Sequence, residues 1–353
     1  MHAVRPDTPV QPLYPENWSQ TMKLGRIAVN GPDGDVARLV LALPEEGRVV
    51  DLKRASVLAL EKQGATGESA RRLSEALFPG SMSAAIGLGE RFLDAARRAD
   101  RERPDEASIS IDEVKWLPAT DPSVVRDGLT FIGHIKGFHE KIGHKPHESL
   151  LKVPGYFKGT PHTVIGHDAE VPWPGYIGHM DYELELGYII GRRGGNLRPE
   201  EARPYLFGIT VFNDFSARDR QSIEMPIQMG PTKCKDFAYG VGPWITTIDE
   251  FADLDAIPME VRVNGATWGK GTSANKLWSV DELIAWASLG EVLEPGDVIG
   301  SGTMGGGSAL ELDRRLQPGD VVELEVGGVG ILRNRMGQPQ PGLWWPEQRA
   351  PFM

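Results

Sequence analysis

The sequence predicts an α+β protein that is mostly β, and three observations lead to this fold class. The chain of 353 residues contains 42 glycines and 27 prolines, which favours turn-rich β structure over a helical bundle. Segments in which apolar and polar residues alternate, the period of a β-strand, recur along most of the chain. Stretches with helical periodicity are concentrated between residues 55 and 99.

The first third of the chain is predicted to form a small unit of its own. A turn cluster at 30–35 separates two alternating segments, which indicates a β-hairpin, and the segment 109–117 returns to strand character. We predict a flexible arm over 1–21, an α+β domain over 22–118, a larger domain over 119–340 and a C-terminal tail over 341–353. The helices expected in the small domain are 55–63, 69–77 and 84–99.

The larger domain is predicted to consist mainly of strands joined by glycine- and proline-containing turns. The Asn-Gly pair at 264–265 indicates a tight hairpin within 260–268. A short amphipathic helix is expected at 280–287. Further strands are expected at 181–190, 207–214, 241–247, 321–326 and 330–334.

Composition excludes several classes of partner. The formal net charge is −11 and no cluster of Lys and Arg offsets it, so we expect no nucleic-acid partner. No apolar run approaches the length of a membrane span, and the polar residues 1–20 do not resemble a signal peptide. The single cysteine, Cys234, excludes an intramolecular disulfide and fits a reducing compartment such as the cytoplasm. As a lone cysteine it is more often inert than nucleophilic.

Two predicted strands carry acidic side chains to one place. Alternation over 181–186 directs Glu183 and Glu185 to the same face, and the next strand ends in Asp214. An isolated pair of this kind is usually a solvated strand face, but the apolar residues that follow indicate a buried strand. Three converging carboxylates form a hard oxygen site that suits Mg²⁺, Mn²⁺ or Ca²⁺ better than zinc.

Two other segments suggest sites more weakly. Residues 134–147 contain four histidines, but their spacing matches no zinc motif and no cysteine accompanies them, so one histidine acting in proton transfer is the better interpretation. The glycine-rich segment 298–307 lacks the Lys-Ser/Thr ending and the helix context of a phosphate-binding loop. We therefore expect no nucleotide site.

Five motifs in order give the chain a resemblance to the fumarylacetoacetate hydrolase family over roughly residues 115–337. The resemblance implies a mixed β-sheet roll that carries the active site, a smaller N-terminal domain and a homodimer. The motifs are Asp-x-Glu-Leu-Glu-Leu (181–186), Asn-Asp-Phe-Ser-Ala-Arg-Asp-Arg-Gln (213–221), Gly-Pro-x-x-x-Lys-Asp-Phe (230–237), Ser-Gly-Thr (301–303) and Pro-Gly-Asp (318–320).

The resemblance also implies roles for particular residues. The family's metal ligands fall on Glu183, Glu185 and Asp214, with Asp127 as a fourth carboxylate seven residues before a histidine. That histidine, His134, looks like the catalytic base, with His139 as the alternative and Glu311 as its partner. The remaining expected roles are oxyanion stabilisation by Lys235 with Gln221 or Arg218, and substrate contacts at Tyr156, Arg218, Thr303 and Tyr239.

Two departures from the family pattern accompany these roles. Cys234 stands where the family usually has glycine before the lysine, and Ala238 and the bulky Tyr239 follow where small residues are usual. We expect Tyr239 to alter the size or pose of the substrate. Without the family resemblance, Arg218 is expected simply to pair with Asp214 or Asp219, and Lys235 to lie on the surface; with the resemblance, functional roles are favoured for both.

The activity implied is metal-dependent hydrolysis of a carbon–carbon bond in a β-diketone-type acid, such as an acylpyruvate or fumarylacetoacetate, in the catabolism of aromatic compounds. Mg²⁺ is the first choice of cofactor, with Mn²⁺ or Ca²⁺ as alternatives. Sister activities of the family are decarboxylation and hydration or isomerisation of 2-oxo acids; a decarboxylase needs no attacking water, so the His134 and Glu311 pair favours hydrolysis. An inactive metal-binding scaffold is a further alternative.

Overall fold

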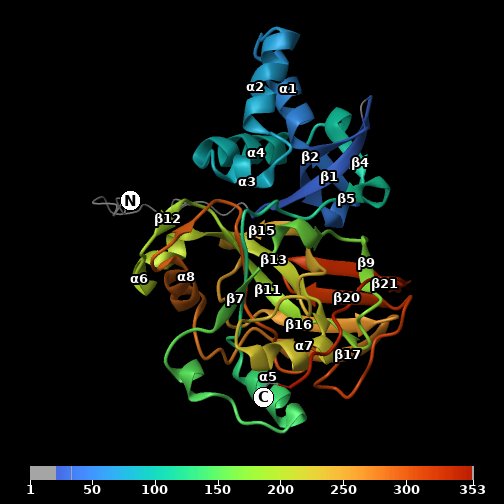
Figure 1. Cartoon of the computed structure of the whole chain (residues 1–353). Coiled ribbons are helices and arrows are strands. Elements are labelled where there is room, and N and C mark those ends of the chain that lie inside the picture. The colour runs from blue at the N-terminus through green and yellow to red at the C-terminus, as the bar shows by residue number, and fades with distance from the viewer. Residues whose placement is uncertain (1–20, 33, 352–353) are drawn as a thin grey trace.

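Two β-sheets carry most of the fold in the computed structural model, which describes residues 21–32 and 34–351 (Figure 1). The larger sheet has 12 strands and contains antiparallel and parallel pairs. These strands are β1 (Lys23–Gly31), β2 (Gly34–Leu43), β3 (Arg48–Asp51), β4 (Ser108–Ser110), β5 (Lys115–Trp116), β6 (Val125–Gly128), β7 (Tyr156–Gly159), β8 (Val164–Ile165), β11 (Leu184–Ile190), β13 (Leu206–Asp214), β15 (Tyr239–Thr247) and β19 (Val298–Gly300).

A smaller sheet packs on the central strands of the larger one, so that β20 and β21 contact β13. Its order is β17-β16-β20-β21-β9. The predicted fold class, α+β and mostly β with a mixed sheet, is confirmed. The bounds are β9 (Glu170–Pro174), β16 (Pro258–Val263), β17 (Ala266–Thr272), β20 (Val321–Val326) and β21 (Gly330–Gln340), and two short pairs join β10 (Met180–Asp181) to β14 (Ser216–Ala217) and β12 (Gly194–Gly195) to β18 (Val292–Leu293).

Helices lie at opposite ends of the molecule. Four of them gather beside the N-terminal strands, and α5 and α7 lie at the far end of the larger sheet (Figure 1). The side chains of Asp51 and Thr66 accept hydrogen bonds from the first turns of α1 and α2, which explains where these helices begin. The bounds are α1 (Leu52–Lys62), α2 (Gly67–Leu77), α3 (Met82–Ile86), α4 (Glu90–Glu102), α5 (Ile132–Ile142), α6 (Pro199–Ala202), α7 (Arg218–Glu224) and α8 (Val280–Ser288).

Three predicted elements are broken in the structure. The single helix expected at 84–99 is two helices, α3 and α4, because the glycine-rich residues between them are poor helix formers. The strand expected at 109–117 is interrupted by a 3₁₀ turn between β4 and β5. The strand expected at 181–190 divides into β10 and β11, and its second part is buried on both faces. The Asn-Gly hairpin between β16 and β17 is confirmed.

The larger sheet continues across the predicted domain boundary at residue 118. Strand β1 pairs with β15, with Lys23 opposite Thr246. A buried cluster that includes Met22 and Phe92 from the N-terminal part also includes Phe212 from the C-terminal part. The division into two domains at 118 therefore remains a prediction. Residues 1–20 of the predicted arm lie outside the described residues.

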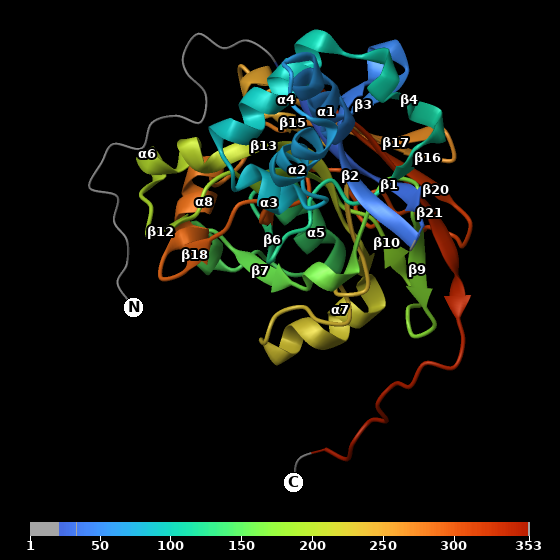
Figure 2. The same ribbon diagram turned by 90° about the horizontal axis from the view of Figure 1, so that it is seen from above.

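The end of the chain turns back toward α7. Figure 2 shows the segment after β21 leaving the body of the molecule on the side where α7 lies. In this tail Trp344 is 82% exposed. The ring of Trp345 instead packs on Tyr176, with 4.8 Å between ring centroids, and the Arg220 guanidinium lies 4.7 Å from the centre of the Trp345 ring. The tail thus contacts the helix that contains Arg218 and Gln221.

Candidate active site

Four carboxylates converge at the middle of the larger sheet because of its strand order. Strands β13, β11, β19 and β6 are neighbours, and they carry Asp214, Glu185, Gly300 and Asp127 respectively. Glu183 lies just before β11. All four acidic side chains are buried, and one potential ligand atom from each lies within 4.8 Å of the others. The structure thus brings together the four residues predicted as metal ligands.

The space at this cluster fits a cation. A Cβ atom on Gly300 would collide with Asp127 Oδ1 and would lie 2.7 Å from Glu185 Oε2, so glycine keeps the carboxylate oxygens clear. The buried Oδ1 atoms of Asp127 and Asp214 have no hydrogen-bond partner among the described residues. Unpaired buried carboxylate oxygens are costly, and a divalent cation with a preference for oxygen ligands would satisfy them.

Raised pKa values of Asp127 and Glu185 indicate that their charged forms are unfavourable without a nearby cation. Burial, together with the neighbouring Glu185, raises the pKa of Asp127 well above its ordinary value. Burial also raises the pKa of Glu185, with a further contribution from Asp214. For Glu183 the effect of burial is outweighed by Arg218, Lys235 and His134, which hold its pKa well below the ordinary range.

Two buried cations flank the carboxylates. Lys235 Nζ donates to Glu183 Oε2 (2.6 Å), to Ser216 Oγ (2.7 Å) and to Asp214. Arg218 donates through Nε to Asp181 (2.7 Å) and through a terminal nitrogen to Glu183 (2.7 Å). The expectation that Arg218 pairs with Asp214 or Asp219, and that Lys235 lies on the surface, is wrong because both cations are buried against other acidic groups.

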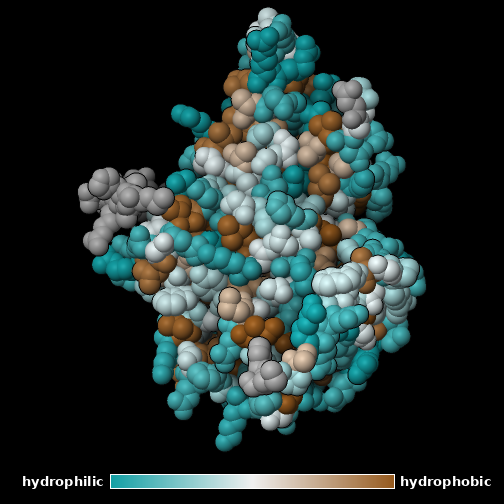
Figure 3. Space-filling view, in the orientation of Figure 1, coloured by the Kyte–Doolittle hydropathy of each residue, from teal (hydrophilic) through white to brown (hydrophobic). Residues whose placement is uncertain are grey.

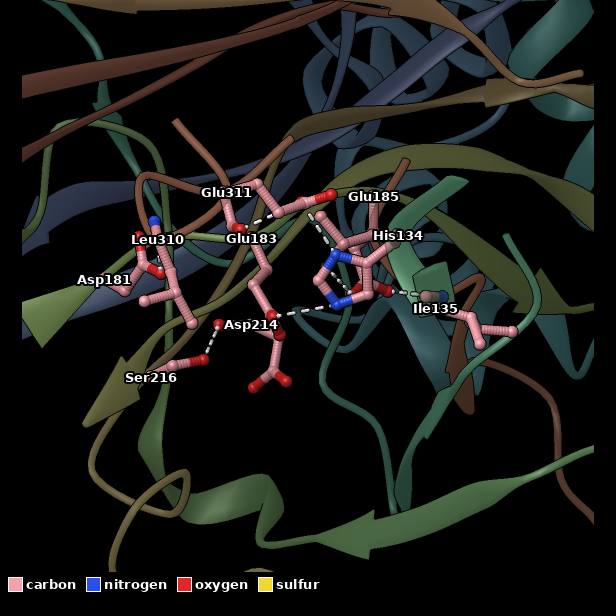
Figure 4. Close-up of polar contacts among 12 residues, drawn as sticks. His134, Ile135, Asp181, Glu183, Glu185, Asp214, Ser216, Leu310 and Glu311 are labelled. Atoms are coloured by element: carbon pink, nitrogen blue, oxygen red, sulfur yellow. Dashed lines mark hydrogen bonds and ion pairs between the residues drawn. The ribbon is translucent and has the colours of Figure 1, made fainter. Parts of the chain in front are cut away.

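A histidine and a glutamate form a second feature of the site. His134 on α5 places Nδ1 2.8 Å from Glu311 Oε2 and Nε2 3.5 Å from Glu183 Oε1, so its ring lies between the two glutamates (Figure 4). Glu311 also accepts hydrogen bonds from Ser308 Oγ (3.0 Å) and the Gly306 amide (3.2 Å). With the Nδ1 proton held by Glu311, Nε2 is left as the atom that can accept a proton.

The alternative base, His139, is placed differently. Its Nδ1 lies 2.7 Å from the carbonyl oxygen of Ile135 in the same helix. No contact joins His139 to Glu311 among those in the described part of the chain. Glycine at 137 lets Glu311 approach α5, since a Cβ there would lie 2.8 Å from Glu311 Oε1. The geometry therefore favours His134 as the base.

Asp181 connects the two features and was not predicted as a site residue. Its carboxylate is buried; it accepts from Arg218 Nε and from the amides of Ala309 (2.8 Å) and Leu310 (3.2 Å). The close-up in Figure 4 shows Asp181 beside Leu310, next to Glu311. Asp181 thus holds both the arginine and the segment that presents Glu311 to His134. The sequence feature that could have identified Asp181 is its position as the first acidic residue of the Asp-x-Glu motif.

The predicted substrate contacts differ in their positions. Tyr156, Gln221 and Thr303 line the cavity above the carboxylates. Tyr156 donates to Glu291 (3.0 Å), and Thr303 donates to Glu185 (3.2 Å). Gln221 accepts from the Arg218 guanidinium (3.1 Å).

Tyr239 does not fit its predicted role. It is not among the residues that line the cavity. Its ring stacks on Phe212, and its hydroxyl donates to Asp236 (3.0 Å). The side chain is fully buried within the sheet. The structure therefore contradicts the expectation that Tyr239 contacts the substrate.

The weaker sequence signals lead to no separate site. The group of potential metal ligands within residues 21–32 and 34–351 contains only carboxylates and none of the clustered histidines. Cys234 is buried, and burial beside Glu224 raises its pKa to about 12, which disfavours the reactive thiolate. No helix in the described part of the chain combines the length and the apolar character needed to cross a membrane.

Fold and site together define a buried cluster of four carboxylates on a mixed sheet, which could hold a metal ion, and comparison with known proteins gives the family. Residues 123–337 match the model of the fumarylacetoacetate (FAA) hydrolase C-terminal domain. The chain belongs to this family. The named relatives described below are enzymes.

Curated relatives include two tautomerases. The chain is 28% identical over 270 residues to oxaloacetate tautomerase YisK of Bacillus subtilis, covering 73% of this chain and 87% of that protein. It is 31% identical over 261 residues to the mitochondrial oxaloacetate tautomerase FAHD2A of Homo sapiens, covering 73% and 80%.

Solved structures of similar fold include two hydrolases. Maleylpyruvate hydrolase from Sphingobium sp. SYK-6, in complex with manganese(II) and pyruvate, aligns with a TM-score of 0.65 at 22% identity, over 90% of this chain and 100% of that one. A fumarylacetoacetate hydrolase from Exiguobacterium antarcticum aligns with a TM-score of 0.61 at 25% identity, over 90% and 99%.

Proposed function

We propose that this protein is a metal-dependent hydrolase that cleaves a carbon–carbon bond in a β-diketone-type acid. The observation that carries the proposal is the His134–Glu311 pair, in which His134 Nε2 faces the carboxylate cluster, 3.5 Å from Glu183 Oε1. A tautomerase or decarboxylase needs no attacking water, whereas hydrolysis needs a base to activate one. An oriented histidine next to a metal site supplies that base.

The residues present fit a divalent cation, and Asp127, Glu183, Glu185 and Asp214 would hold it. When bound, such a cation polarises the substrate carbonyl and neutralises charge that develops on the dicarbonyl oxygens. We propose Mg²⁺ as the physiological ion, with Mn²⁺ as the alternative. The manganese in the structurally similar maleylpyruvate hydrolase supports a divalent cation at this position.

The protein side chains carry the proton transfers. His134 Nε2 removes a proton from water as the water oxygen attacks the carbonyl carbon, and Glu311 stabilises the imidazolium. Lys235 and Gln221 donate hydrogen bonds to the oxyanion that forms, a role in which one donor is worth about 10²–10³-fold in rate. As the carbon–carbon bond breaks, its electron pair passes to the leaving carbon, which takes the proton back from His134.

A keto–enol tautomerase of a 2-oxo acid is the second candidate. The specific observation in its favour is the similarity to two oxaloacetate tautomerases, each matched over 73% of this chain. The same pocket can serve it, since His134 Nε2 can move a proton between carbon and oxygen without a water. The two candidates differ in whether a carbon–carbon bond breaks.

Product identification distinguishes the candidates. The purified protein would be incubated with acetylpyruvate, fumarylacetoacetate or oxaloacetate, with Mg²⁺ or Mn²⁺ and again with EDTA, and followed by NMR. We expect metal-dependent appearance of two acid fragments from a diketo acid, and loss of that activity in His134→Gln. Enol–keto exchange of oxaloacetate with intact diketo acids would instead support the tautomerase, and carbon dioxide release would indicate a decarboxylase.

We further propose that the protein acts in the cytoplasm, in the breakdown of aromatic compounds, as a homodimer. The single, buried and free cysteine fits a reducing compartment and so supports the cytoplasm. Light scattering coupled to size-exclusion chromatography would test the dimer, with a mass of twice 38.7 kDa as the expected result.

A further inference from the structure

The cavity above the carboxylates is much larger than a short oxo acid requires. Its volume is about 900 Å³. Cavities of roughly 300–1,000 Å³ hold ligands of drug size, whereas oxaloacetate or acetylpyruvate has only about nine non-hydrogen atoms. The space beyond the four carboxylates is therefore large enough to accommodate a substituent in addition to the group that reacts.

One side of this space is apolar. Ile135, Phe138 and Ile142 line the cavity from α5, at spacings of three and four residues that place them on one face of the helix. Leu150 and Met225 add to the apolar lining of the cavity. We call these five residues the apolar wall. The space-filling view in Figure 3 shows brown, hydrophobic atoms in the lower part of the molecule, the end where α5 and α7 lie in Figure 1.

Phe138 joins the apolar wall to the reacting centre. Its ring centroid lies 5.8 Å from that of His134, and the Arg218 guanidinium lies 5.7 Å from the Phe138 ring centre. A substrate bound with its dicarbonyl at the carboxylates and its attacked carbon near His134 Nε2 would direct its acyl group past Phe138. The acyl group would then lie along Ile142 and Met225, which are 44% and 46% exposed without a ligand.

The charges in the cavity disfavour a second acid group on this substituent. Among the described lining residues, Arg218 and Lys235 are the lysine and arginine side chains present, and both are paired with the carboxylates at its floor. A carboxylate at the far end of a diacid such as fumarylacetoacetate would face Phe138, Ile142 and Leu150 and the lining histidines. The described lining at this end offers apolar contacts and contains no Lys or Arg side chain to pair with that carboxylate.

Resting on the function proposed above, we infer that the preferred substrate is a β-diketo monocarboxylic acid with a large apolar acyl group, either aromatic or an aliphatic chain. The carboxylates, His134 and Lys235 bind and cleave the part that all such acids share. The apolar wall selects the acyl group. Oxaloacetate and acetylpyruvate, which lack this group, are then poor substrates.

A matched series of acylpyruvates tests the inference. The ratio kcat/KM would be measured with Mn²⁺ for acetylpyruvate, hexanoylpyruvate, benzoylpyruvate and the diacid fumarylpyruvate. We expect hexanoylpyruvate and benzoylpyruvate to exceed acetylpyruvate by at least about tenfold, since added methylenes in a hydrophobic pocket are each worth about tenfold or more. Equal values across the series, or a preference for fumarylpyruvate, would overturn the inference while leaving the hydrolase proposal intact.

Substitutions in the apolar wall locate the preference. Met225→Ser should lower the ratio of benzoylpyruvate to acetylpyruvate turnover about three- to tenfold, and Phe138→Ala should lower it further. Ile223→Ser is the matched control. Ile223 lies in α7, two residues before Met225, is 53% exposed and does not line the cavity. An equal effect of Ile223→Ser would mean that the preference does not arise from the apolar wall.

A binding measurement separates failure of this inference from failure of the proposed reaction. If no diketo acid is cleaved, calorimetric titration of the Mn²⁺-loaded protein with 2-oxobutanoate and with 2-oxo-4-phenylbutanoate still tests the apolar wall. We expect the phenyl compound to bind at least about tenfold more tightly, and Met225→Ser to reduce that difference. Equal affinities would refute selection by the apolar wall whichever reaction the site performs.

Discussion

The floor and the outer wall of the cavity are built in opposite ways. At the floor, four carboxylates from β6, β11 and β13 and their flanks are buried and held by Lys235, Arg218 and backbone amides. At the apolar wall, Ile142 of α5 and Met225 after α7 are 44% and 46% exposed. Strand register thus sets the positions of the carboxylates, whereas α5 supplies both His134 and, in our proposal, the part of the apolar wall that selects the substrate. The following experiments test this division.

The largest effect is expected at the His134–Glu311 pair. Glu311→Gln removes the negative charge that stabilises the His134 imidazolium and presents an amide that can donate to Nδ1, so the wrong tautomer is favoured. We expect kcat to fall about 10²–10⁴-fold, with metal affinity retained, measured by steady-state kinetics and Mn²⁺ titration. Glu106→Gln, an exposed control far from the site, should have no effect. A Glu311→Gln enzyme with full hydrolase activity would remove the basis of the hydrolase proposal.

The next effect concerns space at the floor. Gly300→Ala places a methyl group against Asp127 and Glu185, and we expect Mn²⁺ affinity to fall about 10–100-fold, as for other groups that orient metal ligands. Isothermal titration calorimetry would measure it. Gly67→Ala at the start of α2 is the control, with unchanged affinity. Normal metal binding by Gly300→Ala would show that the four carboxylates do not enclose the ion.

A substitution of Asp181 tests whether this residue positions both Arg218 beside the carboxylates and Glu311 beside His134. Asp181→Asn leaves the buried Arg218 with a single acidic partner, and we expect the free energy of unfolding to fall by about 3–5 kcal/mol in urea denaturation. Because Asp181 also holds the segment before Glu311, kcat should fall about tenfold at a temperature where the variant is folded, while Mn²⁺ affinity changes little. Asp313→Asn, which removes a surface pair with Lys141, should cost at most about 1 kcal/mol. A variant that loses stability but keeps full kcat would make Asp181 only structural.

The sequence alone predicts the residues of the carboxylate cluster better than it predicts the contacts around them. Glu183, Glu185 and Asp214 were predictable because each lies in a short strand motif, and Asp127 and His134 because their seven-residue spacing resembles the family. Contacts between distant segments were not predictable: Asp181 meets Ala309 across 128 positions.

Tyr239 illustrates the other limit. It is opposite Asp214 in the β13–β15 pairing, yet its side chain lies against Phe212 and not in the cavity. Strand register shows that Tyr239 and Asp214 share a face of the sheet, but it does not show that the Tyr239 ring packs on the neighbouring Phe212 ring instead of reaching the cavity. The apolar wall was likewise hidden, since α5 becomes part of the cavity only through tertiary packing.

The smallest effect is expected at the C-terminal tail. Trp345→Ala removes the ring that packs on Tyr176 and Arg220 outside α7, so the helix bearing Gln221 should be less firmly held. We expect KM for a diketo acid to rise about two- to fivefold with little change in kcat, consistent with cation–π contacts of about 0.5–1 kcal/mol at exposed sites. Trp344→Ala is the matched control, since that neighbouring ring is largely in solvent. Equal effects of the two variants would argue against a specific role of Trp345.

The isolated, buried thiol of Cys234 has a practical consequence. Because its high pKa and lack of exposure protect it from alkylating reagents, a cysteine introduced on the surface would be the single position modified by a maleimide dye. Lys145, exposed in the loop after α5, is a suitable position for such a Lys145→Cys label. Fluorescence from that dye would report directly on movement at the mouth of the cavity as substrates of different sizes bind.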